Sequence, residues 1–184
     1  VYTYENTHEI VRLICSTLAG EGLKKGDRIL IYARQNPEAI FLFLSCAFLG
    51  VVVIPLNEAL SDRAVSSIVE ATQPRLCFLG HRETDEQGKW FGETKRILFD
   101  EEESRQGVFS EWINPEINFC DYPSVRPEDD CVILFTSGST GLPKGIPVSN
   151  GRLFRSAELV SKQFDWNEDD RFISKGNLGS MSGW

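Results

Sequence analysis

Small hydroxyl and glycine residues gather just after Phe135, in a run that ends with a lysine and a glycine. From Thr136 to Gly145 the run reads Thr-Ser-Gly-Ser-Thr-Gly-Leu-Pro-Lys-Gly. Glycines permit close backbone approach, and successive exposed N–H groups form a concavity that suits an anion. Hydroxyls add donors, and a lysine adds a point positive charge. The composition therefore predicts a polyphosphate-binding loop with these candidate ligands: Thr136, Ser137, Gly138, Ser139, Thr140, Gly141 and Lys144.

Two familiar phosphate-binding loops do not match this run. The P-loop requires Gly-Lys-Ser or Gly-Lys-Thr at its end, but here Pro143 precedes the lysine and Gly145 follows it. The dinucleotide pattern G-x-G-x-x-G also fails, because Gly138 and Gly141 have no glycine correctly placed before them. A glycine-rich surface turn after a strand remains the structural alternative.

The ten residues 136–145 resemble, almost letter for letter, the AMP-binding signature of the adenylate-forming superfamily. This superfamily contains acyl-CoA synthetases, luciferases and nonribosomal adenylation domains. Residues 2–5 and 22–28 are similar to the usual opening of its large domain, and residues 48–57 to its second signature. The resemblance implies that the loop grips the β- and γ-phosphates of ATP, with hydroxyls and backbone amides as donors and Lys144 as the charge partner.

The resemblance implies an ATP-dependent acid:thiol ligase that activates a carboxylic acid as acyl-adenylate and releases pyrophosphate. Its acceptor would be coenzyme A or the phosphopantetheine of a carrier protein. Members of the superfamily are much longer than 184 residues, so the chain is expected to be an incomplete N-terminal portion, 1–184, of the large domain. The catalytic residues and the Mg²⁺ ligands are expected downstream of Trp184. The alternative is that this piece is inert by itself, a nucleotide-binding or structural half that needs the rest of the protein.

Two departures leave the acid substrate open. Acyl-CoA ligases often carry a Thr-His pair shortly after the loop, where this chain has Ser149 and Asn150. They also tend to place a histidine or an aromatic residue near the acyl pocket, about 35 residues beyond the loop lysine, and by counting Ser180 falls there.

Composition excludes several classes of protein. A hydrophobic fraction of 41% with 25% charged residues is typical of a globular protein, and the net charge of −8 argues against nucleic-acid binding. The 5 cysteines lack a C-x-x-C spacing and mostly lie in apolar runs, which favours buried free thiols in a reducing, cytoplasmic setting. His8 and His81 are too scattered to suggest a metal site. If the chain is a piece of a domain, its uncovered packing faces favour self-association.

Helical and strand patterns alternate before the loop and indicate an α/β fold with a mostly parallel sheet flanked by helices. The uncharged stretch 39–56 is interpreted as a buried helix that runs into a buried strand, not as a membrane span. After the loop, we expect an amphipathic helix with Leu153, Phe154, Ala157 and Val160 on one face. The expected helices are 4–21, 37–49, 61–73 and 150–164, and the expected strands are 28–33, 51–55, 75–79, 96–99, 132–136, 146–149 and 171–174.

Overall fold

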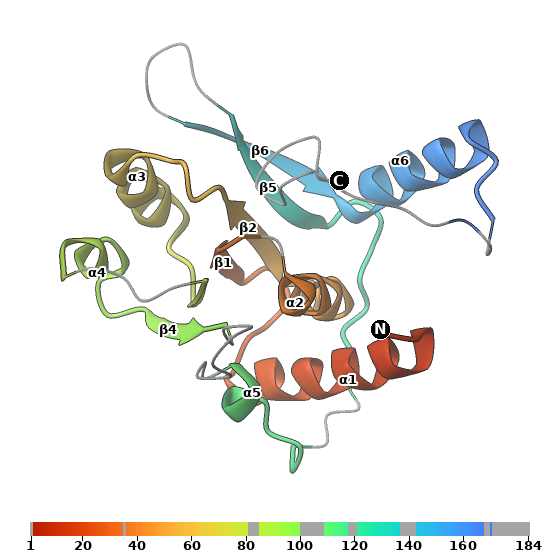
Figure 1. Ribbon diagram of the computed structural model, residues 1–184, viewed down its shortest axis with the longest axis horizontal. Coiled ribbons are helices and arrows are strands. Elements are labelled where there is room, and N and C mark those ends of the chain that lie inside the picture. Colours follow the sequence, from red (N-terminus) through yellow and green to blue (C-terminus); the bar gives the residue numbers. More distant parts are fainter. Residues whose placement is uncertain are drawn as a thin grey trace.

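Six strands form one sheet in the order β4-β3-β1-β2-β5-β6 (Figure 1). The computed structural model describes residues 2–34, 36–80, 85–99, 109–117, 121–136, 143–167 and 170. Neighbouring strands are parallel except β5 and β6, which are antiparallel. The strands are β1 Arg28–Tyr32, β2 Val52–Leu56, β3 Leu76–Leu79, β4 Lys95–Leu98, β5 Asp130–Thr136 and β6 Lys144–Ser149. The predicted class, a mostly parallel α/β sheet, is therefore confirmed.

Helices cover both faces of the sheet. In β1, Ile29 and Ile31 pack into the cluster that contains α1, α2 and α5, while Leu30 and Tyr32 pack into the cluster that contains α3. This alternation is what the two-residue period of a strand produces when both faces are buried. The helices are α1 Tyr4–Gly20, α2 Pro37–Leu49, α3 Asp62–Thr72, α4 Asp85–Phe91, α5 Phe109–Trp112 and α6 Asn150–Gln163.

Local sequence sets the ends of α2. The side chain of Asn36 accepts a hydrogen bond of 2.7 Å from the backbone N–H of Ala39, and Pro37 occupies the first turn. At the other end Gly50 adopts a left-handed conformation with φ of 67°. Inside the protein, Ser45 Oγ donates to the carbonyl of Val11, so α2 is hydrogen-bonded to α1 within the core. The stretch 39–56 is thus a buried helix followed by a buried strand, as expected.

The irregular middle of the chain contains two helices that the sequence did not predict, α4 and α5. The second of them brings Phe109 and Trp112 against Phe78, with ring centroids 6.1 and 5.2 Å away. Phe99 joins the same cluster. The expected strand at 171–174 lies outside the described residues.

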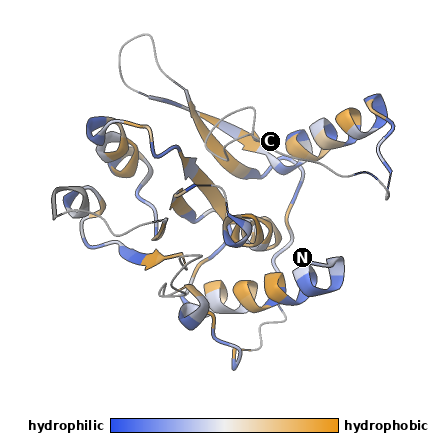
Figure 2. Ribbon diagram, in the orientation of Figure 1, coloured by the Kyte–Doolittle hydropathy of each residue, from blue (hydrophilic) through white to orange (hydrophobic). Residues whose placement is uncertain are grey.

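Helix α6 forms as predicted, and Leu153 packs against the cluster around Val132, but the apolar side chains of Phe154 and Leu159 are exposed. None of its residues is buried, and Phe154 is 73% exposed. Figure 2 shows hydrophobic residues along this exposed helix. Among the described residues, no helix is long and apolar enough to cross a membrane.

Candidate phosphate-binding site

The two ends of the candidate loop lie side by side in an antiparallel ladder. Thr136 is the last residue of β5, Lys144 is the first residue of β6, and the two are direct partners across the strands. Thr136 is half-buried, whereas Lys144 is exposed. Ser137, Gly138, Ser139, Thr140 and Gly141 lie outside the described residues. The structure therefore brings together the first and last of the predicted ligands.

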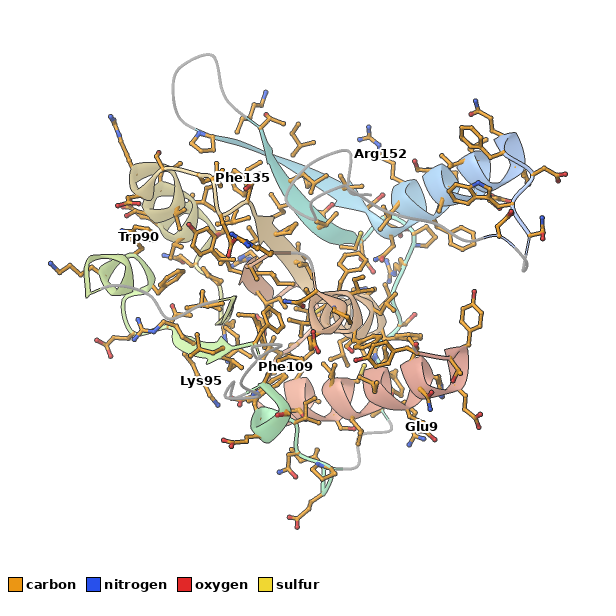
Figure 3. All side chains as sticks on the ribbon, in the orientation of Figure 1. Glu9, Trp90, Lys95, Phe109, Phe135 and Arg152 are labelled. Carbon is orange, nitrogen blue, oxygen red and sulfur yellow. The ribbon has the colours of Figure 1, made fainter. Side chains whose placement is uncertain are left out.

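The base of the loop is closely packed. Phe135 is paired with Gly145, and a Cβ atom added at Gly145 would lie 3.1 Å from Cζ of the phenylalanine ring. An aromatic ring across a glycine is a known way to fix the register of an antiparallel pair. Figure 3 shows Phe135 on the side of the ladder that faces α3, where it joins the cluster around Leu30 and Ile54. The same added atom would lie 3.1 Å from Cγ2 of Ile133, so a side chain at this position would crowd both neighbours and require them to shift.

The loop begins at the carboxyl edge of the parallel part of the sheet. Strand β5 runs parallel to β2, with Val53 opposite Val132. In open α/β sheets, ligands bind outside the carboxyl ends of the strands. Thr136 follows the C-terminal end of β5 and Lys144 lies opposite it, so a hydroxyl donor and a cation stand at the edge where a ligand is expected.

The opposite end of β5 is held by an ion pair between residues far apart in sequence. Lys25 Nζ lies 2.5 Å from Asp129 Oδ2 and also donates to the carbonyl of Ser124. The carbonyl of Asp129 accepts from the backbone and side-chain amides of Asn150. The hydrogen bond from Lys25, together with one from the Arg126 amide, lowers the pKa of the Asp129 carboxyl below its ordinary value. Asp129 therefore connects the turn before β1, the start of β5 and the start of α6.

This geometry gives Asn150 a structural contact at the position where the resembled ligases often carry histidine. Its side-chain amide donates to the Asp129 carbonyl over 3.2 Å. Ser149 precedes α6 as its N-cap and makes no side-chain capping bond. Ser180 lies outside the described residues.

The carboxyl edge of the sheet also contains a hollow that the sequence analysis did not predict. It has a volume of about 390 Å³ and is lined by Arg34, Asn36, Glu58 and Gly80, which follow β1, β2 and β3. The guanidinium Nε of Arg34 lies 3.0 Å from a carboxylate oxygen of Glu58. The hollow could have been predicted from the positions of its residues in the sequence. Polar residues that directly follow buried parallel strands lie together at one edge of the sheet.

The cysteines are thiols enclosed by apolar side chains. Cys15, Cys46, Cys77 and Cys131 are buried, as expected, and Cys120 lies outside the described residues. Burial raises the pKa of Cys15 and of Cys131 to about 11. Within the described ranges, no group of three His, Cys, Asp or Glu residues could hold a metal ion.

A mostly parallel α/β sheet, with a hydroxyl-rich sequence that ends in a lysine at its carboxyl edge, is the arrangement expected of proteins that bind nucleotide phosphates. The family model for AMP-binding enzymes matches residues 1–184. The chain belongs to the AMP-binding enzyme family.

Curated relatives agree with this assignment. The acetyl-coenzyme A synthetase of Helicobacter pylori is 26% identical over 208 residues, which cover 100% of this chain and 31% of the relative. The acetyl-coenzyme A synthetase of Emericella nidulans is 29% identical over 204 residues, 98% of this chain and 30% of the relative. The 4-coumarate–CoA ligase 3 of Arabidopsis thaliana is 26% identical over 181 residues, which cover 96% of this chain and 32% of the relative. The chain therefore spans about a third of the length of these relatives.

Solved structures with the same fold include a coenzyme A synthetase and an ATP-bound protein. O-succinylbenzoate coenzyme A synthetase from Bacillus subtilis, in complex with AMP, aligns with a TM-score of 0.81 at 20% identity over 98% of this chain and 45% of its own. ATP-bound MatB from Rhodopseudomonas palustris aligns with a TM-score of 0.85 at 20% identity over 98% of this chain and 36% of its own. At this identity, the likeness shows the fold alone.

Proposed function

We propose that the chain is the phosphate-gripping part of an ATP-dependent acid:thiol ligase. The observation that carries the proposal is the pairing of Thr136 with Lys144, which closes the signature loop at the carboxyl edge of the sheet. A hydroxyl and an ammonium group held opposite each other suit the polyanionic end of a nucleotide. The family match and the names of the curated relatives support the same reaction class.

In the proposed reaction, a carboxylate oxygen of the acid attacks the α-phosphorus of ATP. The new bond joins the acid to AMP, and the bond to pyrophosphate breaks, so that pyrophosphate leaves and no proton has to move. The ammonium group of Lys144 offsets the charge of the phosphates that depart. Thr136 donates its hydroxyl to the same phosphates. Mg²⁺, when bound, shields phosphate charge, and we propose that its ligands lie in the remaining two thirds of a full-length ligase.

The acceptor in the second half-reaction is proposed to be the thiol of coenzyme A or of a carrier-protein phosphopantetheine. The names of the relatives favour coenzyme A, since they are coenzyme A ligases. Buried free thiols are compatible with a cytoplasmic setting, which we also propose.

ATP–pyrophosphate exchange tests the proposal. The full-length protein is incubated with ATP, Mg²⁺, labelled pyrophosphate and a panel of carboxylic acids, and the 184-residue chain is assayed beside it. We expect acid-dependent exchange by the full-length protein and none by the chain alone, because the described site supplies phosphate contacts only. Absence of acid-dependent exchange by the full-length protein contradicts the ligase proposal. Exchange by the chain alone contradicts the proposal that it is inert by itself.

A further inference from the structure

Strand β5 uses one residue more than β6 between the same two cross-strand pairs (Figure 1). Asp130 is paired with Ser149 at the start of β5, and Thr136 is paired with Lys144 at its end. The interval from 130 to 136 is therefore matched by the shorter interval from 149 to 144, and the register shifts at Cys131. Such an extra residue is a β-bulge, and bulges are frequent next to active sites, where they re-aim a side chain.

The packing of the β5 side chains shows the same irregularity. Along a regular strand, consecutive side chains point to opposite faces. Cys131 and Val132 are consecutive, yet both are buried in one cluster with Leu134. Ile133 and Phe135 pack against the cluster on the α3 side of the sheet. The alternation is thus regular from Val132 to Phe135 and is broken at Cys131.

The side chain of Cys131 is bonded to the opposite strand at the bulge. Its Sγ donates a hydrogen bond of 3.3 Å to the carbonyl of Val148, and the residue is 2% exposed. A bulge disrupts the ladder locally, while backbone carbonyls in a folded protein need donors. The thiol therefore supplies a donor to β6 at the point where the ladder is interrupted.

The start of the ladder is held by contacts that do not involve the bulge. The carbonyl of Asp129 accepts hydrogen bonds from the backbone and side-chain amides of Asn150, the first residue of α6. The backbone N–H of Gly151 donates to the carbonyl of Pro127 over 2.8 Å. The register of the β5–β6 pair can therefore be counted from this fixed end.

A regular register counted from the fixed end would separate the two described phosphate ligands. Without the bulge, Phe135 would lie opposite Lys144, and Thr136 would lie opposite Pro143. A slip of one residue also turns each side chain of a strand to the other face relative to its partner strand. The hydroxyl of Thr136 and the ammonium group of Lys144 would then point to opposite faces of the sheet.

We propose that the β-bulge at Cys131 positions the phosphate loop by placing Thr136 opposite Lys144. Cys131 is a positioning residue, because it acts through the ladder and not on the phosphates. It lies five residues before Thr136, about 17 Å along the strand. This assignment rests on the proposed ligase function.

Three variants separate the effect of the register from a loss of stability. Cys131→Val removes the thiol donor, and its β-branched side chain favours a regular strand. Cys131→Ser keeps an O–H donor at the same position. Cys15→Val is the matched control, because Cys15 is also buried and its Sγ donates to the carbonyl of Ser45 over 3.5 Å, in the packing of α1 against α2.

The first measurement is the KM for ATP in pyrophosphate exchange by the full-length protein, together with the urea midpoint. We expect Cys131→Val to raise the KM about 10-fold, since a displacement of about 1 Å in binding groups can cost up to about 100-fold. Cys131→Ser should stay within about threefold of the wild type. Cys15→Val should lower the urea midpoint by as much as Cys131→Val and leave the KM within about twofold.

The second measurement reads the register directly and does not depend on activity. Nuclear Overhauser effects between the backbone protons of Thr136 and Lys144 are recorded on the isotopically labelled 184-residue chain. We expect the contact in the wild type and in Cys131→Ser. In Cys131→Val it should lose more than half of its intensity, with a new contact between Phe135 and Lys144.

The proposal requires both changes in Cys131→Val, so either change without the other overturns it. An equal rise in KM for Cys15→Val also overturns it, because the KM would then follow stability and not register. If the wild type shows no acid-dependent exchange, the ligase function fails and the positioning role fails with it, whereas the backbone contact still shows whether the bulge sets the register. Should Cys131→Val not fold, Cys131→Ala, which removes the donor without adding a branched carbon, decides in its place.

Discussion

Thr136 and Lys144 are direct partners in the β5–β6 ladder, although seven residues separate them in the chain. The pairing fixes where the candidate phosphate loop begins and ends, and it is held by the contact between Phe135 and Gly145 one step further into the ladder. A loop anchored in this way presents a hydroxyl and an ammonium group side by side at the edge of the sheet.

Gly145 tests this anchoring. We expect Gly145→Val to slow pyrophosphate exchange by the full-length protein and to lower its free energy of unfolding by about 1–3 kcal/mol, because the added atoms crowd the ring of Phe135 and the side chain of Ile133. Urea denaturation and the exchange assay measure the two effects. The double variant Gly145→Val with Phe135→Leu, in which the ring is also replaced, should recover part of the exchange rate and part of the free energy of unfolding. A double variant no better than Gly145→Val would show that the ring contact is not what requires glycine.

The ion pair between Lys25 and Asp129 gives a pH-dependent prediction. Because the folded-state pKa of Asp129 lies below its ordinary value of 3.8, the pair stabilises the fold above that pH, and the contribution is lost as pH falls further. We expect Asp129→Asn to lower the urea midpoint at pH 7 and to lose this effect below pH 3.8. Glu128→Gln is the control, since the carboxylate of Glu128 lies 3.9 Å from Arg126 with both side chains 69% exposed. An equal shift for both variants would contradict the special role of Asp129.

The buried thiols predict that stability is lost as pH rises, the opposite of the pH dependence expected for Asp129. Cys15 and Cys131 bind their protons more tightly in the folded state, with a pKa of about 11 against an ordinary value of 9.0. Their contribution to the free energy of unfolding is complete below pH 9.0 and is lost as pH rises to about 11. We expect slow alkylation of both residues at pH 8 and fast alkylation in urea, measured residue by residue by mass spectrometry. Rapid labelling of the folded chain at pH 8 would show that these thiols are not enclosed.

The uncovered face of α6 predicts self-association of the 184-residue chain. Phe154 is 73% exposed and Phe164 63%, and apolar patches of this kind favour contact between copies. We expect the sedimentation coefficient to rise with concentration, and Phe154→Asp to remove most of that rise. Arg155→Asp is the control, because Arg155 is an exposed neighbour on the same helix that adds no apolar surface. A monomer at all concentrations would refute the prediction.

Sequence reasoning located what local patterns encode. The helices expected over 4–21 and 37–49 are α1 Tyr4–Gly20 and α2 Pro37–Leu49 of the structure. Sequence reasoning did not find α4 or α5, because helices of 7 and 4 residues carry too few periodic positions.

The sequence analysis also did not predict contacts between residues that are far apart in the chain. The Lys25–Asp129 pair and the Thr136–Lys144 pairing depend on which strands become neighbours, and a single sequence does not state strand order. The loop itself was recognisable because its chemistry is contiguous. The predicted ligands between Thr136 and Lys144 stay predictions, since they lie outside the described residues.

Replacement of Lys144 tests the central claim most directly. A charge-assisted hydrogen bond contributes about 1.5–3 kcal/mol, so we expect Lys144→Ala to reduce pyrophosphate exchange by the full-length protein by about 10- to 100-fold while the urea midpoint stays unchanged. Lys24→Ala, which removes an exposed lysine from the turn before β1, should leave exchange at the wild-type rate. Exchange by Lys144→Ala at the wild-type rate would contradict the assignment of residues 136–145 as the phosphate-binding loop.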